Sequence, residues 1–115
     1  MKKKQPAEVL PYRAAALLEK IGARISLARR ARLWTQADLA AKIGVSPNTM
    51  VAIEKGRANV AIGLFVKALW ALDLLDSLSQ VASHEEDDLT IAAGVARIPK
   101  RVRDSAQEDL YADAV

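Results

Sequence analysis

The 115-residue chain contains no cysteine, which excludes disulfide bonds and thiol chemistry. Its single histidine, His84, has no second histidine with which to form a metal cluster or a catalytic dyad, and no glycine-rich phosphate-binding loop is present. No apolar run reaches the roughly 20 residues that a membrane span needs, and the basic N-terminus lacks the apolar segment of a signal peptide. These absences predict a cytoplasmic protein that is not an enzyme and that binds neither a metal nor a cofactor.

Aromatic residues make up only 4% of the chain, and no stretch alternates apolar and polar residues as a half-buried strand would. Apolar residues reach 51%, with alanine and leucine dominant, and this composition favours helices. We therefore predict an all-α fold in one domain, with a core of about 55 to 65 residues that dimerisation would enlarge.

Charge is distributed unevenly along the chain, although the net charge is only +3. Residues 1–57 contain 12 Lys and Arg against 4 Asp and Glu, whereas residues 58–115 contain 5 against 10. The first part therefore carries +8 and the second −5. A basic half suits a partner with a phosphate backbone, although a solvated basic face would have the same composition.

The segment 35–56 contains two short helices that are indicated by their end signals. Thr35 is an N-cap residue with Asp38 three positions later, and Gly44 can end the first helix by adopting a positive φ. Ser46 is a second N-cap residue, and a glycine again follows the second helix. Helix, short turn and helix together predict a helix-turn-helix motif.

The second helix of this motif has two different sides. Met50 and Ile53, three residues apart, form its apolar side. The residues predicted to face outward are Pro47, Asn48, Thr49 and Ala52. In a helix-turn-helix motif the second helix enters the DNA major groove, so this row is a candidate base-reading surface. The alternative is an ordinary pair of antiparallel helices in a small bundle, which would have the same caps and periodicity.

Several residues at fixed spacing also match a known family. They are Gln36, Leu39-Ala40, Gly44-Val45-Ser46 and Ile53-Glu54-Lys55-Gly56. On these residues the chain resembles the lambda-repressor-like (Cro/CI, or XRE) helix-turn-helix family from about Ile21 to Leu75. The resemblance implies a five-helix DNA-binding domain, here with an extended first helix and a mostly irregular C-terminal tail.

The motif and the resemblance together predict which residues bind DNA. Pro47, Asn48, Thr49 and Ala52 are the predicted base readers, and the Asn48 amide can bond both N6 and N7 of adenine. The predicted contacts to the DNA backbone are Gln36, Lys42, Ser46, Lys55, Arg57 and Asn59. Gln36 is also expected to brace Asn48. Because one domain reads few base pairs, we expect a homodimer on an inverted repeat of duplex DNA, with half-sites ~34–36 Å apart.

Three residues near the motif carry structural predictions. The resemblance implies that Arg29 pairs with Glu54 as a brace between the first and third helices, the alternative being an exposed Arg29. Gly22 costs the first helix roughly 1 kcal/mol relative to alanine, so a kink or break there is one prediction. Leu33 stands where the family commonly has glycine, and it must either avoid a positive φ or tolerate strain.

The flanking segments complete the predicted organisation. Residues 1–10 are predicted as a disordered basic arm, residues 11–82 as the helix-turn-helix domain, and residues 83–115 as an acidic and basic tail that is flexible or ordered by a partner. The first helix is expected over 12–32 and the fourth over 62–72. A short fifth helix, capped by Asp73 or Asp76, should extend to about Val81.

Two apolar segments outside the motif leave alternatives open. Trp70 forms either a dimer surface, together with Leu74, Leu75 and Leu78, or part of the core. The run Leu72-Asp73-Leu74-Leu75-Asp76-Ser77-Leu78, the acidic stretch after it and Arg97-Ile98-Pro99-Lys100-Arg101-Val102-Arg103 resemble HipB-type antitoxins, which are XRE proteins encoded beside HipA-like kinase toxins.

The resemblance of the tail implies a repressor that regulates its own operon and neutralises a HipA-like kinase. One alternative is a stand-alone phage-type or metabolic regulator without a toxin partner. The other is an interaction module that keeps the fold without binding DNA.

Overall fold

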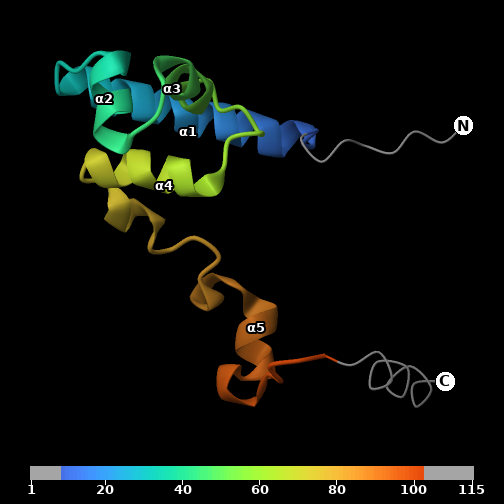
Figure 1. The fold of residues 1–115 in the computed structure, drawn as a ribbon. Helices are drawn as coiled ribbons and strands as arrows, with labels where there is room; N and C mark the ends of the chain where they lie inside the picture. The colour runs from blue at the N-terminus through green and yellow to red at the C-terminus, as the bar shows by residue number, and fades with distance from the viewer. Residues whose placement is uncertain (1–8, 103–115) are drawn as a thin grey trace, which may run out of the picture. The chain divides into compact units, whose positions relative to one another are not determined.

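The computed structural model describes residues 9–102, which form helices and turns without a β-strand (Figure 1). The chain divides after Ser79 into two compact units. The first unit contains α1 (Tyr12–Ala31), α2 (Gln36–Ile43), α3 (Pro47–Glu54), α4 (Ile62–Ala71) and the 3₁₀-helix η1 (Leu75–Leu78). The second unit contains the 3₁₀-helix η2 (His84–Glu86), α5 (Asp88–Ala93) and the 3₁₀-helix η3 (Val95–Arg97).

The predicted all-α fold class is confirmed by these five α-helices. No helix among the described residues combines the length and the apolar character that crossing a membrane requires. The structure describes residues 9 and 10 of the predicted basic arm and residues 83–102 of the predicted tail; the rest of both segments lies outside the described residues.

The core of the first unit lies between its four α-helices. α2 packs on α3 and on α4, while α1 packs on α3. The largest fully buried side chains are Ile25, Leu39, Ile43, Met50 and Leu72. These come from α1, α2, α3 and the residue after α4, and α4 itself adds Ala68 and Leu69, so each helix contributes its apolar side to one core.

α1 is one continuous helix of 20 residues, so the predicted break at Gly22 is wrong. Gly22 is buried, and a Cβ atom there would lie 2.5 Å from the carbonyl oxygen of Glu54 and 2.8 Å from that of Ile53. A Cβ atom added to Gly56, whose φ is 70°, would likewise clash with backbone atoms of Leu18 and Glu19. The two glycines are therefore the points where the backbones of α1 and of the end of α3 touch.

The fifth helix lies elsewhere than predicted. Asp73, with φ of 60°, ends α4, and the N–H groups of Asp73 and Leu74 donate to the carbonyls of Trp70 and Leu69. This is the hydrogen-bond pattern of a helix end, so Asp73 does not begin a new helix. Only the four-residue η1 follows, without a side-chain cap, and α5 occurs in the second unit.

The described part of the second unit, residues 80–102, has local order but no buried core. Ser83 caps η2 by accepting a hydrogen bond from the N–H of Glu85, and Thr90 donates to the carboxylate of Asp87 at the start of α5. None of its described residues, 80–102, is buried. Leu89 is 79% exposed, and Ile91 and Val95 are also exposed. The helices among these residues are therefore stabilised by hydrogen bonds between residues close in the sequence.

Candidate nucleic-acid interface

The turn between α2 and α3 is closed by backbone hydrogen bonds. Gly44 ends α2 with φ of 75° and ψ of 34°, a left-handed conformation that glycine adopts without steric cost. The N–H groups of Gly44 and Val45 donate to the carbonyls of Ala41 and Ala40 at 3.3 and 2.9 Å. The chain direction thereby changes within three residues, and α3 begins at Pro47.

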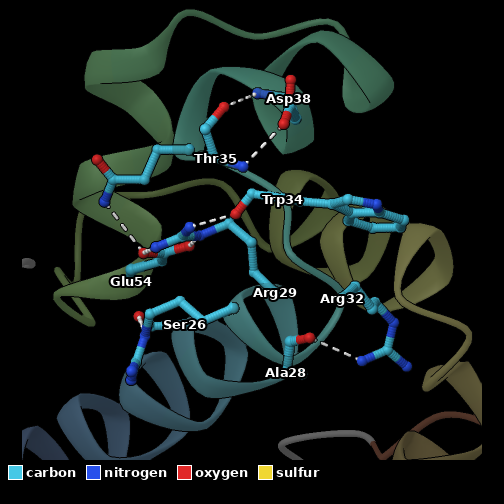
Figure 2. Close-up of polar contacts among 10 residues, drawn as sticks. Ser26, Ala28, Arg29, Arg32, Trp34, Thr35, Asp38 and Glu54 are labelled. Carbon is cyan, nitrogen blue, oxygen red and sulfur yellow. Dashed lines mark hydrogen bonds and ion pairs between the residues drawn. The ribbon is translucent and has the colours of Figure 1, made fainter.

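Both helices of the motif begin at side-chain caps. Thr35 and Asp38 form a reciprocal capping box: the Asp38 N–H donates to Thr35 Oγ1 at 3.0 Å, and the Thr35 N–H donates to Asp38 Oδ2 at 2.8 Å (Figure 2). The backbone hydrogen bond from Thr35 lowers the pKa of the Asp38 carboxyl. Ser46 Oγ accepts the N–H of Thr49 at 3.1 Å and so caps α3, with Pro47 in the first turn. The end signals in the sequence therefore place both helices correctly.

α3 has one buried side and one solvent-facing side. Met50 is completely buried and Ile53 is 3% exposed. Of the four predicted base readers, Pro47 and Asn48 are exposed and Thr49 and Ala52 are half-buried. Asn48, Thr49 and Ala52 line one shallow hollow together with Asn59, Val60, Ala61 and Leu64. The structure thus brings three predicted base readers and one predicted backbone contact together.

Most of the predicted backbone contacts reach solvent. Lys42, Ser46, Lys55, Arg57 and Asn59 are all exposed. Lys55 and Arg57 lie around a second shallow hollow with Glu19 and Gly56, separate from the hollow on α3. The ammonium group of Lys42 lies 4.5 Å from the centre of the Trp34 ring, a cation–π distance. Five of the six predicted backbone contacts are therefore accessible to a partner.

The predicted pair of Arg29 and Glu54 is present as a buried ion pair (Figure 2). Arg29 Nε donates to Glu54 Oε2 at 2.6 Å, and Nη2 donates to Oε1 at 3.1 Å. A third bond runs from Arg29 Nη1 to the carbonyl of Trp34 at 2.7 Å. Arg29 therefore joins the end of α1 to the end of α3 and to the turn before α2.

The environment of Glu54 keeps it ionised. Burial raises the pKa of the Glu54 carboxyl, but hydrogen bonds from Arg29 and Gln36 and the positive charge of Arg29 outweigh burial and lower it. Gln36 Nε2 donates to Glu54 Oε1 at 3.0 Å. The amide that was expected to brace Asn48 instead binds Glu54, and it links the first turn of α2 to the last turn of α3.

Arg32 has a structural role that the sequence did not indicate. Its guanidinium donates to the carbonyls of Ala28 and Leu72, both at 2.7 Å, and so links the ends of α1 and α4. Arg24 and Arg30 are exposed, and Arg30 bonds Ser26 Oγ at 3.3 Å. Because Arg29 and Arg32 are engaged within the domain, only some of the arginines near the end of α1 remain for a phosphate partner.

A family model described as "Transcription regulator-like HTH domain" matches residues 7–71, which extend from the segment before α1 to the end of α4. The matched residues contain α2, α3 and every predicted contact residue. No curated protein matches the chain.

Proposed function

The chain belongs to the family of transcription regulator-like HTH domains and acts in DNA-binding transcription regulation, and we propose that it is a sequence-specific repressor. α3 is the proposed recognition helix, lying in the major groove of duplex DNA. The observation that carries this proposal is the two-sided environment of α3. Met50 and Ile53 anchor the helix in the core, while Asn48 remains in solvent.

The proposed base readers are Pro47, Asn48, Thr49 and Ala52. The Asn48 amide would bond the adjacent donor and acceptor of adenine, and Ala52 would contact a thymine methyl group. The Thr49 hydroxyl lies 3.1 Å from that of Ser46, which orients it at the start of the helix. With a single amide in this row, sequence discrimination would rest on few direct bonds and on the shape of the DNA.

The proposed backbone contacts are Gln36, Lys42, Ser46, Lys55, Arg57 and Asn59. Lys55 and Arg57 lie beyond the C-terminal end of α3, and Lys42 lies in the last turn of α2. Cations at both places suit the two phosphate strands that border one major groove. A homodimer would bind an inverted repeat through two such surfaces.

Paired substitutions test base reading against backbone binding. Asn48→Ala should cost ~1–3 kcal/mol at selected base pairs and little on random DNA, while Arg57→Ala should weaken all sequences and reduce the salt slope by about one unit. Tyr12→Ala, on an exposed residue at the start of α1, is the control. Affinities for an operator and for random duplexes over a salt series supply the measurement. Equal losses on both DNAs from Asn48→Ala would refute its base-reading role.

We further propose that the protein is an antitoxin that represses its own operon and neutralises a HipA-like kinase. Support comes from the resemblance of the tail and from the second unit, whose described residues have no core and expose apolar side chains. Segments of this kind gain a core when a partner covers them. The stand-alone regulator without a toxin is the alternative.

The antitoxin and the stand-alone regulator differ in the gene expected next to theirs and in how substitutions affect kinase inhibition. An antitoxin gene should lie beside a reading frame for a HipA-like kinase. Leu89→Asp should abolish inhibition of that kinase while leaving DNA binding unchanged, and Val9→Asp, at an apolar position of the first unit that is 50% exposed, should leave both unchanged. DNA binding by the chain without a kinase gene beside it would favour the stand-alone regulator.

A further inference from the structure

The outer side of α4 has no covering element among the described residues of the first unit. Gly63, Lys67 and Trp70 follow one another at i, i+4 and i+7, so they lie along one line of the helix; we call this line the α4 face. Trp70 is 61% exposed, and Gly63 and Lys67 are exposed. The opposite side of α4 supplies Ala68 and Leu69 to the core. Trp70 therefore does not belong to the core.

The surroundings of the α4 face are apolar and open. Ile62, at the start of the helix, is 77% exposed, and Leu75 in η1 is 42% exposed. A Cβ atom added to Gly63 would meet nothing within 4 Å, so another backbone can approach the helix there. Exposed tryptophan is characteristic of protein contacts, because tryptophan is enriched in interface cores, and exposed aliphatic side chains at the start of the helix and in η1 add to the apolar surface of this part of the unit.

The charges around Trp70 favour a second copy of this chain. Lys67 precedes Trp70 by three residues and Asp73 follows it by three, and both are exposed. Lys67 lies within α4 about one turn before Trp70, while Asp73 lies just past the helix end, where its N–H donates to the Trp70 carbonyl at 3.0 Å. The two opposite charges therefore lie on either side of Trp70 along the direction of α4. An antiparallel pair of α4 helices would place Lys67 of each copy level with Asp73 of the other. A parallel pair would place like charges level with each other.

The position of the DNA-binding side selects the same arrangement. Leu64 lies about 100° round α4 from Gly63, and it lines the hollow that contains Asn48, Thr49 and Ala52. The proposed DNA surface is therefore turned by about a quarter of the helix circumference from the α4 face. A two-fold axis that pairs the helices antiparallel can point both DNA surfaces in one direction, whereas parallel helices would point them in opposite directions.

We propose that a second copy of this chain docks antiparallel on the α4 face, with Trp70 of both copies at the two-fold axis and Lys67 of each copy paired with Asp73 of the other. Such a contact is isologous, since the same patch serves both copies. The inference rests on the proposed function, because it names the interface of the homodimer that would read an inverted repeat. It adds the residues, the direction of the helices and the charge pairing.

Truncation of Trp70 tests whether the patch is the interface. The full chain should form dimers in sedimentation equilibrium, and Trp70→Ala should raise the dimer dissociation constant by about 30-fold or more, as expected for a central tryptophan. Tyr12→Ala removes another exposed aromatic ring and should leave the constant unchanged. A wild-type chain that stays monomeric up to high micromolar concentration would overturn the proposal, as would an unchanged constant for Trp70→Ala.

A charge exchange tests the antiparallel pairing. Lys67→Glu alone and Asp73→Lys alone should each weaken their own homodimer several-fold, because each creates two like-charge contacts. A mixture of the two variants should recover a heterodimer of nearly wild-type strength, because every pairing is then between opposite charges. A mixture no tighter than its homodimers would overturn the antiparallel geometry. Should Asp73→Lys fail to fold at its positive φ, Asp73→Asn removes the charge and should weaken the dimer by about threefold.

These measurements use no DNA, so they separate the interface from the proposed function. Dimers that depend on Trp70 in a chain that binds no DNA would support the interface and refute the repressor. Salt-dependent DNA binding by a dimer insensitive to Trp70→Ala would support DNA binding and refute the interface. A monomeric chain whose association with a kinase depends on Trp70 would overturn the second copy as occupant of the α4 face.

Discussion

Both units begin helices with side-chain caps, but they differ in whether those helices cover buried residues. In the first unit, Thr35 and Ser46 cap helices whose inner sides meet in a core. In the second unit, Ser83 caps η2 and Thr90 bonds Asp87, yet none of the described residues 80–102 is buried. Caps determine where a helix begins, whereas most helical stability comes from the packing of an apolar face.

One carboxylate in each unit makes this difference measurable. Glu54 is buried and receives hydrogen bonds from Arg29 and Gln36, whereas Asp87 is exposed and receives one from Thr90. The pKa of both carboxyls is lowered, with the Thr90 bond as the main cause at Asp87. Removing the Glu54 carboxylate leaves the buried Arg29 without a partner, while removing the Asp87 carboxylate leaves only groups that water can solvate.

The largest expected effect comes from Glu54→Ala. It should lower the free energy of unfolding of the first unit by ~3–5 kcal/mol, because Arg29 remains buried without its partner. Asp87→Ala is the matched control in the second unit and should leave this free energy unchanged. Thermal and urea denaturation supply the measurement. A shift in melting temperature below about one degree for Glu54→Ala would refute the brace, since 1 kcal/mol corresponds to ~4–8 °C in a domain of this size.

The same carboxylate predicts an acid dependence. The folded-state pKa of Glu54 lies below the ordinary value of about 4.3, so its contribution is complete above that pH and is lost as the pH falls through the folded-state pKa. Glu54→Gln should remove this part of the acid-induced loss of stability. An unchanged acid limb of the stability curve in Glu54→Gln would contradict the prediction.

Leucine truncations compare the two units directly. Leu39 is completely buried, so Leu39→Ala should destabilise the first unit by ~2–5 kcal/mol through lost burial and an internal cavity. Leu89 is 79% exposed, and Leu89→Ala should change the unfolding free energy by less than about 0.5 kcal/mol. Urea midpoints followed by circular dichroism test both. A large loss from Leu89→Ala would show that the second unit has a core in solution.

Glycine substitutions test whether close backbone contact belongs to the first unit alone. Gly22→Ala should cost ~1–3 kcal/mol or more, because the added Cβ meets the backbone of Ile53 and Glu54. Helix propensity alone predicts a gain of about 1 kcal/mol, so the sign of the change is decisive. At Gly94 the atoms nearest to the added Cβ are those of the Arg97 side chain, and Gly94→Ala should leave the first unit unaffected. Ala23→Gly, on the exposed neighbour in α1, should cost roughly 0.5–1 kcal/mol.

The smallest expected effect is a gain from Leu33→Gly. Leu33 has φ of 60° and is 91% exposed, so glycine removes backbone strain without removing packing. The net stabilisation should be roughly 0.5–1 kcal/mol after the greater chain entropy of glycine is counted. Ala82 has φ of 56° in the second unit, and Ala82→Gly should leave the melting temperature of the first unit unchanged. A loss of stability in Leu33→Gly would mean that the leucine side chain makes a stabilising contact.

Much of the first unit could be predicted because its signals are local. The caps at Thr35 and Ser46, the left-handed Gly44 and the apolar pair Met50 and Ile53 each act within a few residues of the chain. The Arg29–Glu54 pair spans 25 residues, and it was predicted only through a family resemblance. The DNA contacts assigned to the outward row stay predictions.

The features that were missed depend on which backbones approach each other in three dimensions. Gly22 reads in the sequence as a weak point in a helix, but its missing side chain lets α1 touch the end of α3. Arg32 resembles any surface arginine until the carbonyl of Leu72, 40 positions later, is brought next to it. Asp73 matches an N-cap by type, while its positive φ shows that it ends α4.

The contact of Gly22 and Gly56 has a consequence for how this domain would meet its operator. The end of α3 is held to α1 by two glycine contacts and by Glu54, so tilting or rotating α3 would separate this end from α1. As the proposed recognition helix, α3 would then adapt little to an imperfect groove, and the adjustment would fall to the DNA. Operators would then be ranked partly by how easily base steps outside the contacts bend or twist, and flexible pyrimidine–purine steps at such positions would favour binding.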